Sequence, residues 1–374
     1  MRVRSITTLT ALLAIALAAP AARAAVLYHV VPLERPPGYT DAFVTDLNAE
    51  GVSAGQVNDD LSHKPRAALW RADGSLALPG IPPGATESVA LGLDDAHNAV
   101  GQALIGGTYR AVRWDAAGVP TLLMTPDGAT YSSAVAIHGG LVAGNVRFAD
   151  GLTRVIRWDA AGNPTVLDLV PGAGAEASAI DLRNGRIAGF ATPSSPELPI
   201  RYDAAGAGTI LQHPDYDGGV ARGINAAGVA AGSLRDADAP NVLLRAATWD
   251  ASGAAHLPGL PAGTTESEIN SIGDDGQSVG YARIGEDDYR GVLWLADGTP
   301  VLLDDLLAPG YAGWRTTLGL AISGNGARIV ANAVAPGSNI ERPVLLVVPE
   351  PSGAALLLLS IAGLVARRRH ARAS

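Results

Sequence analysis

An aromatic residue recurs about every 45 positions through most of this chain, and each copy ends a similar apolar segment such as RAALW or RAVRW. The aromatic positions are Trp70, Trp114, Trp158, Tyr202, Trp249 and Trp294, at intervals of 44 to 47 residues. A glycine follows each aromatic after four residues, at Gly74, Gly118, Gly162, Gly206, Gly253 and Gly298. Glycine adopts the positive φ that a tight hairpin requires. The pattern therefore predicts that one strand ends at the aromatic and that another begins after the glycine.

A second landmark precedes each aromatic by 13 to 17 residues. It is an Asn-, Asp- or Gly-rich turn followed by a short apolar segment, as in LNAEGVSAG, and it ends at Gly55, Gly101, Gly144, Gly189, Gly232 or Gly280. We expect strand A before this turn, strand B ending near the glycine, strand C ending at the aromatic and strand D after the hairpin. Four short antiparallel strands in about 45 residues are the size of one β-propeller blade.

The seventh copy of the repeat is degenerate. Ala331 replaces the landmark glycine, Leu346 replaces the aromatic, and the unit stops after strand C at about Val347. The segment Val26–Val31, which precedes the first strand A, can supply the missing strand D. We therefore predict an all-β propeller of about seven four-stranded blades, closed by the N-terminal strand, because closure protects sheet edges. The weak last unit leaves six blades as the alternative.

The residue two positions before each aromatic is apolar in every unit, as at Val112 and Ile156. Residues two apart in a strand share a face of the sheet. We interpret this face as the packing surface between blades, because a feature present in every repeat usually maintains the fold. The alternative is an aromatic platform for a ligand such as a sugar.

The first 24 residues have the pattern of a signal peptide. Arg2 and Arg4 precede an apolar run, and Ala22 and Ala24 form an A-x-A cleavage site. The mature domain would then span 25–347. The alternative is a first core helix.

The last 27 residues, 348–374, form a separate tail. Val348, Pro349, Glu350 and Pro351 precede an uncharged run of 14 residues (353–366), and Arg367, Arg368 and Arg369 follow that run. The run is short for a helix that spans a membrane, but the arginine cluster would stay on the cytoplasmic side of one. A buried hairpin of the core is the alternative.

This order of motifs resembles the PEP-CTERM sorting tail of exported proteins in Gram-negative bacteria. The resemblance implies a hydrophobic tail helix held transiently in the inner membrane, processing by an exosortase near Pro349–Pro351, and release to the cell surface or the extracellular space. It also implies a link to exopolysaccharide and biofilm matrix. The 45-residue unit itself resembles the HAF-type extracellular repeats of bacteria, which bring no catalytic residues with them.

The sequence contains no recognisable catalytic, cofactor or metal motif. It has no cysteine, its seven histidines never stand four apart, and no nucleophile elbow, phosphate loop or EF-hand loop occurs. Loop carboxylates such as Asp59–Asp60, Asp215–Asp217, Asp274–Asp275 and Glu286–Asp288 are expected to form a solvated acidic surface. We predict no catalytic residue, no cofactor and no metal.

Charge separates the ends of the chain from its body. Seven of the 27 basic residues are arginines at the two ends, which leaves 20 basic residues against 36 acidic ones. An acidic body repels phosphate backbones, so nucleic acid is not expected as a partner. The sequence predicts a non-catalytic surface or matrix protein that binds an extracellular polysaccharide or a surface protein, or acts as a scaffold. The alternative is a glycan hydrolase or lyase with carboxylates around the propeller axis.

Overall fold

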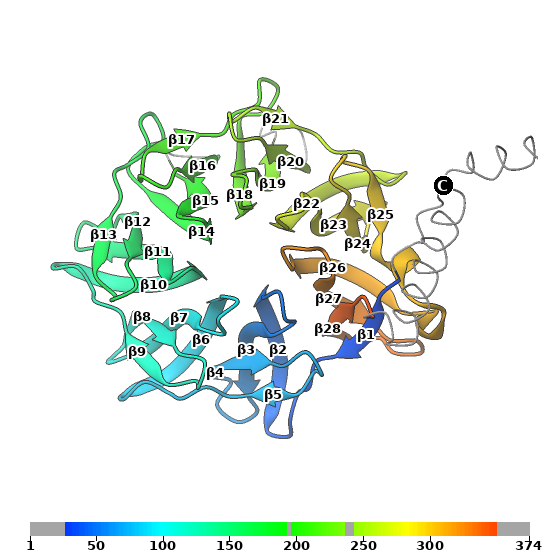
Figure 1. Ribbon diagram of the computed structural model, residues 1–374, viewed down its shortest axis with the longest axis horizontal. Coiled ribbons are helices and arrows are strands. Elements are labelled where there is room, and N and C mark those ends of the chain that lie inside the picture. The colour runs from blue at the N-terminus through cyan, green and yellow to red at the C-terminus, as the bar shows by residue number, and fades with distance from the viewer. Residues whose placement is uncertain (1–26, 193–195, 236–242, 350–374) are drawn as a thin grey trace, which may run out of the picture.

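The computed structural model describes residues 27–192, 196–235 and 243–349, which form seven four-stranded antiparallel sheets around a central axis (Figure 1). In each blade the strands run in order A, B, C, D from the axis outward. The predicted all-β propeller with seven four-stranded blades is confirmed. The predicted signal peptide with Ala22 and Ala24, and the tail from Glu350 onward with Pro351 and Arg367–Arg369, lie outside the described residues.

The strands of each blade have the following bounds. Blade 1 contains β2 (Tyr39–Leu47), β3 (Ser53–Asp59), β4 (Pro65–Trp70) and β5 (Leu76–Ala77), and blade 2 contains β6 (Ala85–Leu93), β7 (Ala99–Ile105), β8 (Thr108–Trp114) and β9 (Pro120–Leu122). Blade 3 contains β10 (Ala129–His138), β11 (Leu141–Phe148), β12 (Thr153–Trp158) and β13 (Pro164–Val166), and blade 4 contains β14 (Ala177–Arg183), β15 (Arg186–Ala191), β16 (Leu198–Tyr202) and β17 (Gly208–Ile210). Blade 5 contains β18 (Gly218–Ile224), β19 (Ala230–Arg235), β20 (Leu244–Trp249) and β21 (Ala255–His256), and blade 6 contains β22 (Thr264–Ile272), β23 (Ser278–Ile284), β24 (Asp288–Trp294) and β25 (Pro300–Leu302). Blade 7 contains β26 (Arg315–Ile322), β27 (Arg328–Val334), β28 (Glu341–Val347) and, as its outer strand, β1 (His29–Pro32).

The N-terminal strand closes the ring. β1 pairs antiparallel with β28, with His29 opposite Val347 and Pro32 opposite Val344. The buried Tyr28 hydroxyl donates a 2.7 Å hydrogen bond to the Gly326 carbonyl in the turn between β26 and β27. The first and last parts of the described chain are therefore held in one sheet, and β28 is covered on its outer edge.

A β-bulge in strand A explains the second glycine landmark. In blade 1, Val44 pairs with Gly55 and Asp46 with Ala54, so that Thr45 is left without a partner residue. The bulge brings the Phe43 carbonyl so close that a Cβ on Gly55 would lie 1.9 Å from its oxygen. The five equivalent glycines would meet the same strand A carbonyl at 1.9 to 2.0 Å. These glycines lie within strand B and not near its end, so the predicted position of strand B was wrong.

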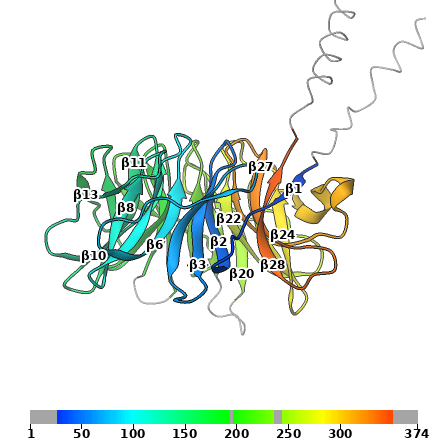
Figure 2. The ribbon, with the colours of Figure 1, turned by 90° about the horizontal axis from the view of Figure 1, so that it is seen from below.

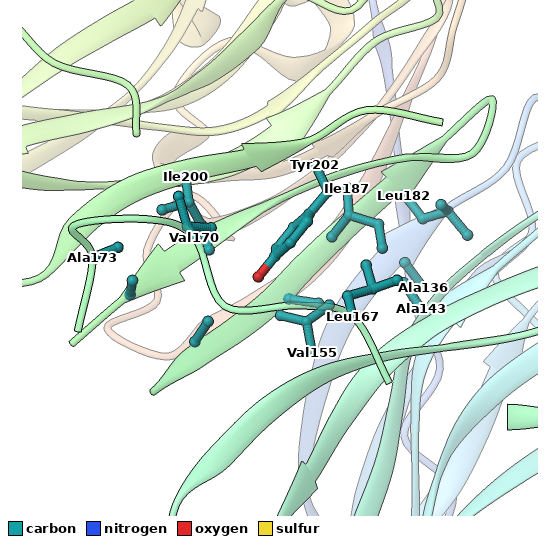
Figure 3. Packing of buried hydrophobic residues seen from close by; sticks show 13 residues of the cluster. Ala136, Ala143, Val155, Leu167, Val170, Ala173, Leu182, Ile187, Ile200 and Tyr202 are labelled. Atoms are coloured by element: carbon teal, nitrogen blue, oxygen red, sulfur yellow. The ribbon is translucent and has the colours of Figure 1, made fainter. Parts of the chain in front are cut away.

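The recurring aromatic residues fill the spaces between blades. All six side chains are buried, as are the apolar residues two positions before them. The Trp114 and Trp158 indoles donate hydrogen bonds of 2.8 and 2.7 Å to the Gly80 and Met124 carbonyls in the connection from the previous blade. In blade 4 the aromatic is Tyr202, and its hydroxyl makes the equivalent hydrogen bond by donating to the Asp168 carbonyl at 3.0 Å. Its ring lies among aliphatic side chains of blades 3 and 4 (Figure 3).

Two short helices interrupt the repeat between blades 6 and 7. The 3-10 helices η1 (Leu303–Leu306) and η2 (Pro309–Tyr311) follow β25, and the sequence repeat gave no sign of them. The amide groups of Tyr28 and Ala308 bond to the carbonyls of Leu306 and Tyr28. This connection therefore supports the start of the closing strand. None of the described helices is long and apolar enough to cross a membrane.

We expect Gly101→Ala to lower the free energy of unfolding by about 2–4 kcal/mol, because the new Cβ would collide with a backbone oxygen that cannot move away. Denaturant unfolding of the purified variant measures this change. Gly310→Ala is the control, since a Cβ there meets no atom within 4 Å, and its cost should stay within about 0.5 kcal/mol. Equal stability of the two variants would contradict the role assigned to the bulge.

Candidate binding site in the central channel

The central channel contains a chamber of about 180 Å³ that is lined by strand A of all seven blades. It lies at the end of the channel where the turns between strands A and B gather. We call this side of the disc the A–B face, and the opposite side, which carries the B–C loops and the D–A connections, the far face. The chamber is the natural place to look for a site, because it joins residues from seven separate repeats.

The bulges determine which side chains line the chamber. The residue at the bulge of each blade lines it, and these residues are Thr45, Leu91, Val135, Ile180, Arg222, Asn270 and Leu320. Four of the seven are aliphatic. The Asn270 amide donates to the Gly319 carbonyl at 2.9 Å, and Arg222 pairs with the buried carboxylate of Glu268 at 2.5 Å. The bulge positions are thus mainly aliphatic, with their polar groups already engaged, whereas the aspartates and Arg183 that also line the chamber make its exposed surface mainly polar.

Two aspartates stand at the position directly after the bulge, Asp46 in blade 1 and Asp181 in blade 4. The Asp46 carboxylate accepts backbone N–H groups from Leu47 and from Leu93 of the next blade, each at 2.7 Å. Asp181 does the same with Leu182 at 2.7 Å and with Ile224 of blade 5 at 2.8 Å. Each carboxylate therefore links strand A of its own blade to strand A of the next.

The positions of these carboxylates raise their pKa values. Burial raises the pKa of Asp46 to about 7, the nearby Asp181 carboxylate adds to the shift, and the two N–H donors oppose it. Burial also raises the pKa of Asp181, against its own two N–H donors. Both side chains line the chamber and remain partly accessible to water there.

An ion pair crosses the A–B mouth of the chamber. Arg183 of blade 4 pairs with Asp274 of blade 6, and its Nε lies 3.2 Å from the Asp274 carboxylate. Asp274 also accepts the Ala226 N–H of blade 5 at 2.8 Å, so the pair passes over the intervening blade. A Cβ on Gly324 of blade 7 would lie 3.2 Å from the Arg183 guanidinium. The pair thus bonds three consecutive blades together at the mouth and lies close to the fourth.

His138 and Asp94 lie at the same mouth. Burial and the Arg183 charge lower the pKa of His138, so the imidazole favours its neutral form there. Asp94 accepts the N–H groups of Ala96 and Asn98 and the Asn98 amide within its own turn. The His138 ring accepts the Asn184 N–H of blade 4 at 3.3 Å, so His138 and Asp94 both serve backbone contacts at the turns.

Of the acidic groups singled out in the sequence, the described structure brings one to the channel. Asp274 lies at the mouth, whereas Asp59–Asp60, Asp215–Asp217 and Glu286–Asp288 lie in or directly beside B–C loops or D–A connections of the far face. Among the described residues, no group of three or more His, Asp and Glu side chains could hold a metal ion. Val348 and Pro349 are the described part of the predicted sorting signal, and the Val348 N–H bonds to the Ala327 carbonyl at 3.0 Å.

The sequence reasoning missed Asp46, Asp181 and Arg183. A signal for the aspartates was present, because the equivalent residues of the other units are Gly92, Ala136, Gly223, Ser271 and Ala321. An aspartate among such small residues stands out once the repeats are aligned on the bulge. No comparable signal marks Arg183, since its partner is 91 positions away.

Comparisons with known proteins show the fold. No protein-family model matches the chain, and no curated protein matches it. A chain of the Mitotic Checkpoint Complex is 16% identical, covers 93% of this chain and 99% of its own length, and has a TM-score of 0.52. An oligogalacturonate lyase in complex with manganese is 11% identical over 86% of this chain and 96% of its own, with a TM-score of 0.52. The oligogalacturonate lyase of Vibrio parahaemolyticus is 9% identical over 86% of this chain and 97% of its own, with a TM-score of 0.51.

We expect Asp46→Asn to change how stability depends on pH. The pKa of Asp46 is about 7 in the folded protein and 3.8 ordinarily, so the folded state holds the proton more tightly. Its contribution to stability is complete below about pH 4 and is lost as the pH rises through about 7. Because water in the channel screens the carboxylate, we expect the wild type to lose about 1–2 kcal/mol of stability over this range. Asp46→Asn cannot titrate at this position and lacks the loss.

Denaturant unfolding at pH 4, 6 and 8 tests this prediction, with the exposed Asp305→Asn as the control. The stability of Asp46→Asn relative to the wild type should rise between pH 4 and pH 8, while that of the control should not. A pH-independent difference for Asp46→Asn would show that the carboxylate does not titrate in this range.

Proposed function

We propose that this chain is an exported, non-catalytic propeller of the cell surface or extracellular matrix, which binds a matrix component or supports the matrix structurally. The observation that carries the proposal is the position of the two chain ends. Tyr28 and Val348 both bond to the turn between β26 and β27, so the described chain begins and ends side by side on the A–B face (Figure 2). A tail that starts at Val348 leaves the propeller from this face.

This position of the chain ends predicts how the propeller would be oriented relative to a membrane. A tail held in the inner membrane, as its resemblance to the PEP-CTERM signal implies, would turn the A–B face toward the membrane. The far face would then point away from it, with its B–C loops and D–A connections available to partners. Loops carried on a rigid scaffold are where binding surfaces usually occur.

The channel supports a non-catalytic role. Both oxygens of Asp46 and both of Asp181 accept backbone N–H groups, and the Glu268 carboxylate accepts from Arg222 and Ser233. Groups used in this way stabilise the contacts between blades. A glycosidase would need one carboxylic acid free to protonate a leaving group and a second carboxylate free to act on the sugar or on water.

The alternative is a glycan hydrolase or lyase, and one observation favours it. Asp46 and Asp181 share a chamber, and the Asp181 carboxylate helps to raise the pKa of Asp46, as happens between paired catalytic carboxylates. The two readings differ in one measurable respect. The enzyme requires turnover of a polysaccharide that is lost in Asp46→Asn and Asp181→Asn, whereas the binding protein retains its ligand unchanged in length.

We predict that the tail directs processing. In a Gram-negative host that carries an exosortase, the extracellular protein should lack Arg367–Arg369, as C-terminal sequencing by mass spectrometry can show. Replacing Pro349, Glu350 and Pro351 by alanine should leave the chain full-length in the membrane fraction. Alanine at Pro79, Ile81 and Pro82, in the connection between blades 1 and 2, serves as the control and should not alter processing. An intact arginine cluster on the extracellular wild type would contradict the proposal.

A further inference from the structure

We propose that a groove at the closing seam of the ring, on the far face, is a binding site for a neutral polysaccharide. This inference rests on the proposed function and names the partner of that exposed face. The groove, called here the seam groove, has a volume of about 790 Å³ and lies between blades 7 and 1. The end of β1 and the segment that follows it (32–37) form one wall, and the start of β28 forms another.

The seam groove exposes two large apolar side chains. Phe43 of β2 lines it with 52% of its surface exposed, and Ile340 lines it with 64% exposed. Phe43 is one of only three phenylalanines in the chain. The aromatic residues that recur in six of the seven repeats are buried, so they are not available to a ligand. Phe43 is therefore the aromatic side chain that this groove offers for stacking.

Polar groups without partners accompany this apolar surface. Asp41, Asn332 and Arg342 line the groove, and within the described residues their side chains make no hydrogen bond or ion pair. By contrast, Glu341 accepts the Thr317 hydroxyl and Arg35 donates to the Thr40 carbonyl. One carboxylate, one amide and one guanidinium thus stay available around the apolar surface.

This combination matches the chemistry of a sugar ring. A pyranose presents a face of C–H groups, which packs on an aromatic ring, and an edge of hydroxyl groups, which donate to carboxylates and accept from guanidinium and amide groups. The three available groups sum to no net charge, and the body of the chain is acidic. A polyanion would be repelled over its whole length, so the geometry points to a neutral chain.

The position of the groove agrees with such a ligand. β28 begins beside the groove at Glu341, on the far face, and runs to the A–B face at Val347, whereas β1 starts at the A–B face and reaches only the middle of β28 at Pro32, which pairs with Val344. The groove therefore opens on the side opposite to the tail. A long polymer outside the membrane can reach it without passing the anchor.

Affinity electrophoresis of the full-length chain in gels that contain β-1,4-glucan, galactomannan or alginate tests the proposal. We expect retardation by at least one of the two neutral polymers and none by alginate. Phe43→Ala should weaken binding about tenfold and Arg342→Ala about threefold, while Phe43→Tyr keeps a ring and should bind within twofold of the wild type. Leu61→Ala is the matched control, because Leu61 is 93% exposed on the far face outside the groove and its loss should have no effect.

The outcomes separate the groove from the general proposal. Wild-type binding to a neutral polymer that Phe43→Ala and Arg342→Ala leave unchanged would overturn the seam groove and retain a binding function. Retardation by alginate alone would overturn the choice of a neutral ligand. Binding to neither these polymers nor isolated matrix would overturn both the groove and the binding form of the proposed function. Thermal unfolding of each variant confirms that it is folded.

Discussion

The close contact between a strand A carbonyl and a strand B glycine is the constraint on which the rest of this propeller depends. With an oxygen 1.9 to 2.0 Å from where a Cβ would be, only glycine permits the bulge in six of the blades. The bulge turns one residue of each strand A toward the axis and directs the next residue toward the neighbouring blade. The aliphatic residues at four of the bulges in the chamber wall and the cross-blade bonds of Asp46 and Asp181 both follow from this displacement. In blade 7, Ala331 replaces the glycine and pairs instead with Gly319, with a register irregularity on either side of the pair.

Ring closure is the second constraint, and it relates the fold to the proposed role. Because β1 completes blade 7, the two ends of the described chain are neighbours on one face. The same closure creates the seam, where the segment after β1 crosses from blade 7 to blade 1 and leaves a groove that the internal blade junctions need not share. Closure of the ring by β1 thus determines both the face from which a tail would leave and the face that would remain exposed.

Much of the architecture could be predicted from the sequence because each repeat carries its own strand signals. The Trp70-type aromatics, the hairpin glycines such as Gly118 and the missing seventh strand D gave the blade count and the closure. The channel could not be predicted in the same way. Its geometry depends on the bulge, which shifts the register by one residue and so changes which side chains reach the axis. The pairing of Arg183 with Asp274 depends on tertiary structure, since the partners belong to blades that are not adjacent. The helices η1 and η2 could not be predicted from the repeat pattern, because each occurs only once in the described chain.

The central claim is that the A–B face lies toward the membrane and the far face away from it while the tail is anchored. The chain has no cysteine, so single cysteines can report on each face. Leu61→Cys on the far face and Glu50→Cys on the A–B face, each in a chain whose processing is blocked, can be labelled in spheroplasts with a bulky maleimide that does not cross membranes. The account predicts rapid labelling of Leu61→Cys and much slower labelling of Glu50→Cys, although both label equally once the protein is solubilised in detergent. Equal rates in spheroplasts, or faster labelling of Glu50→Cys, would contradict it.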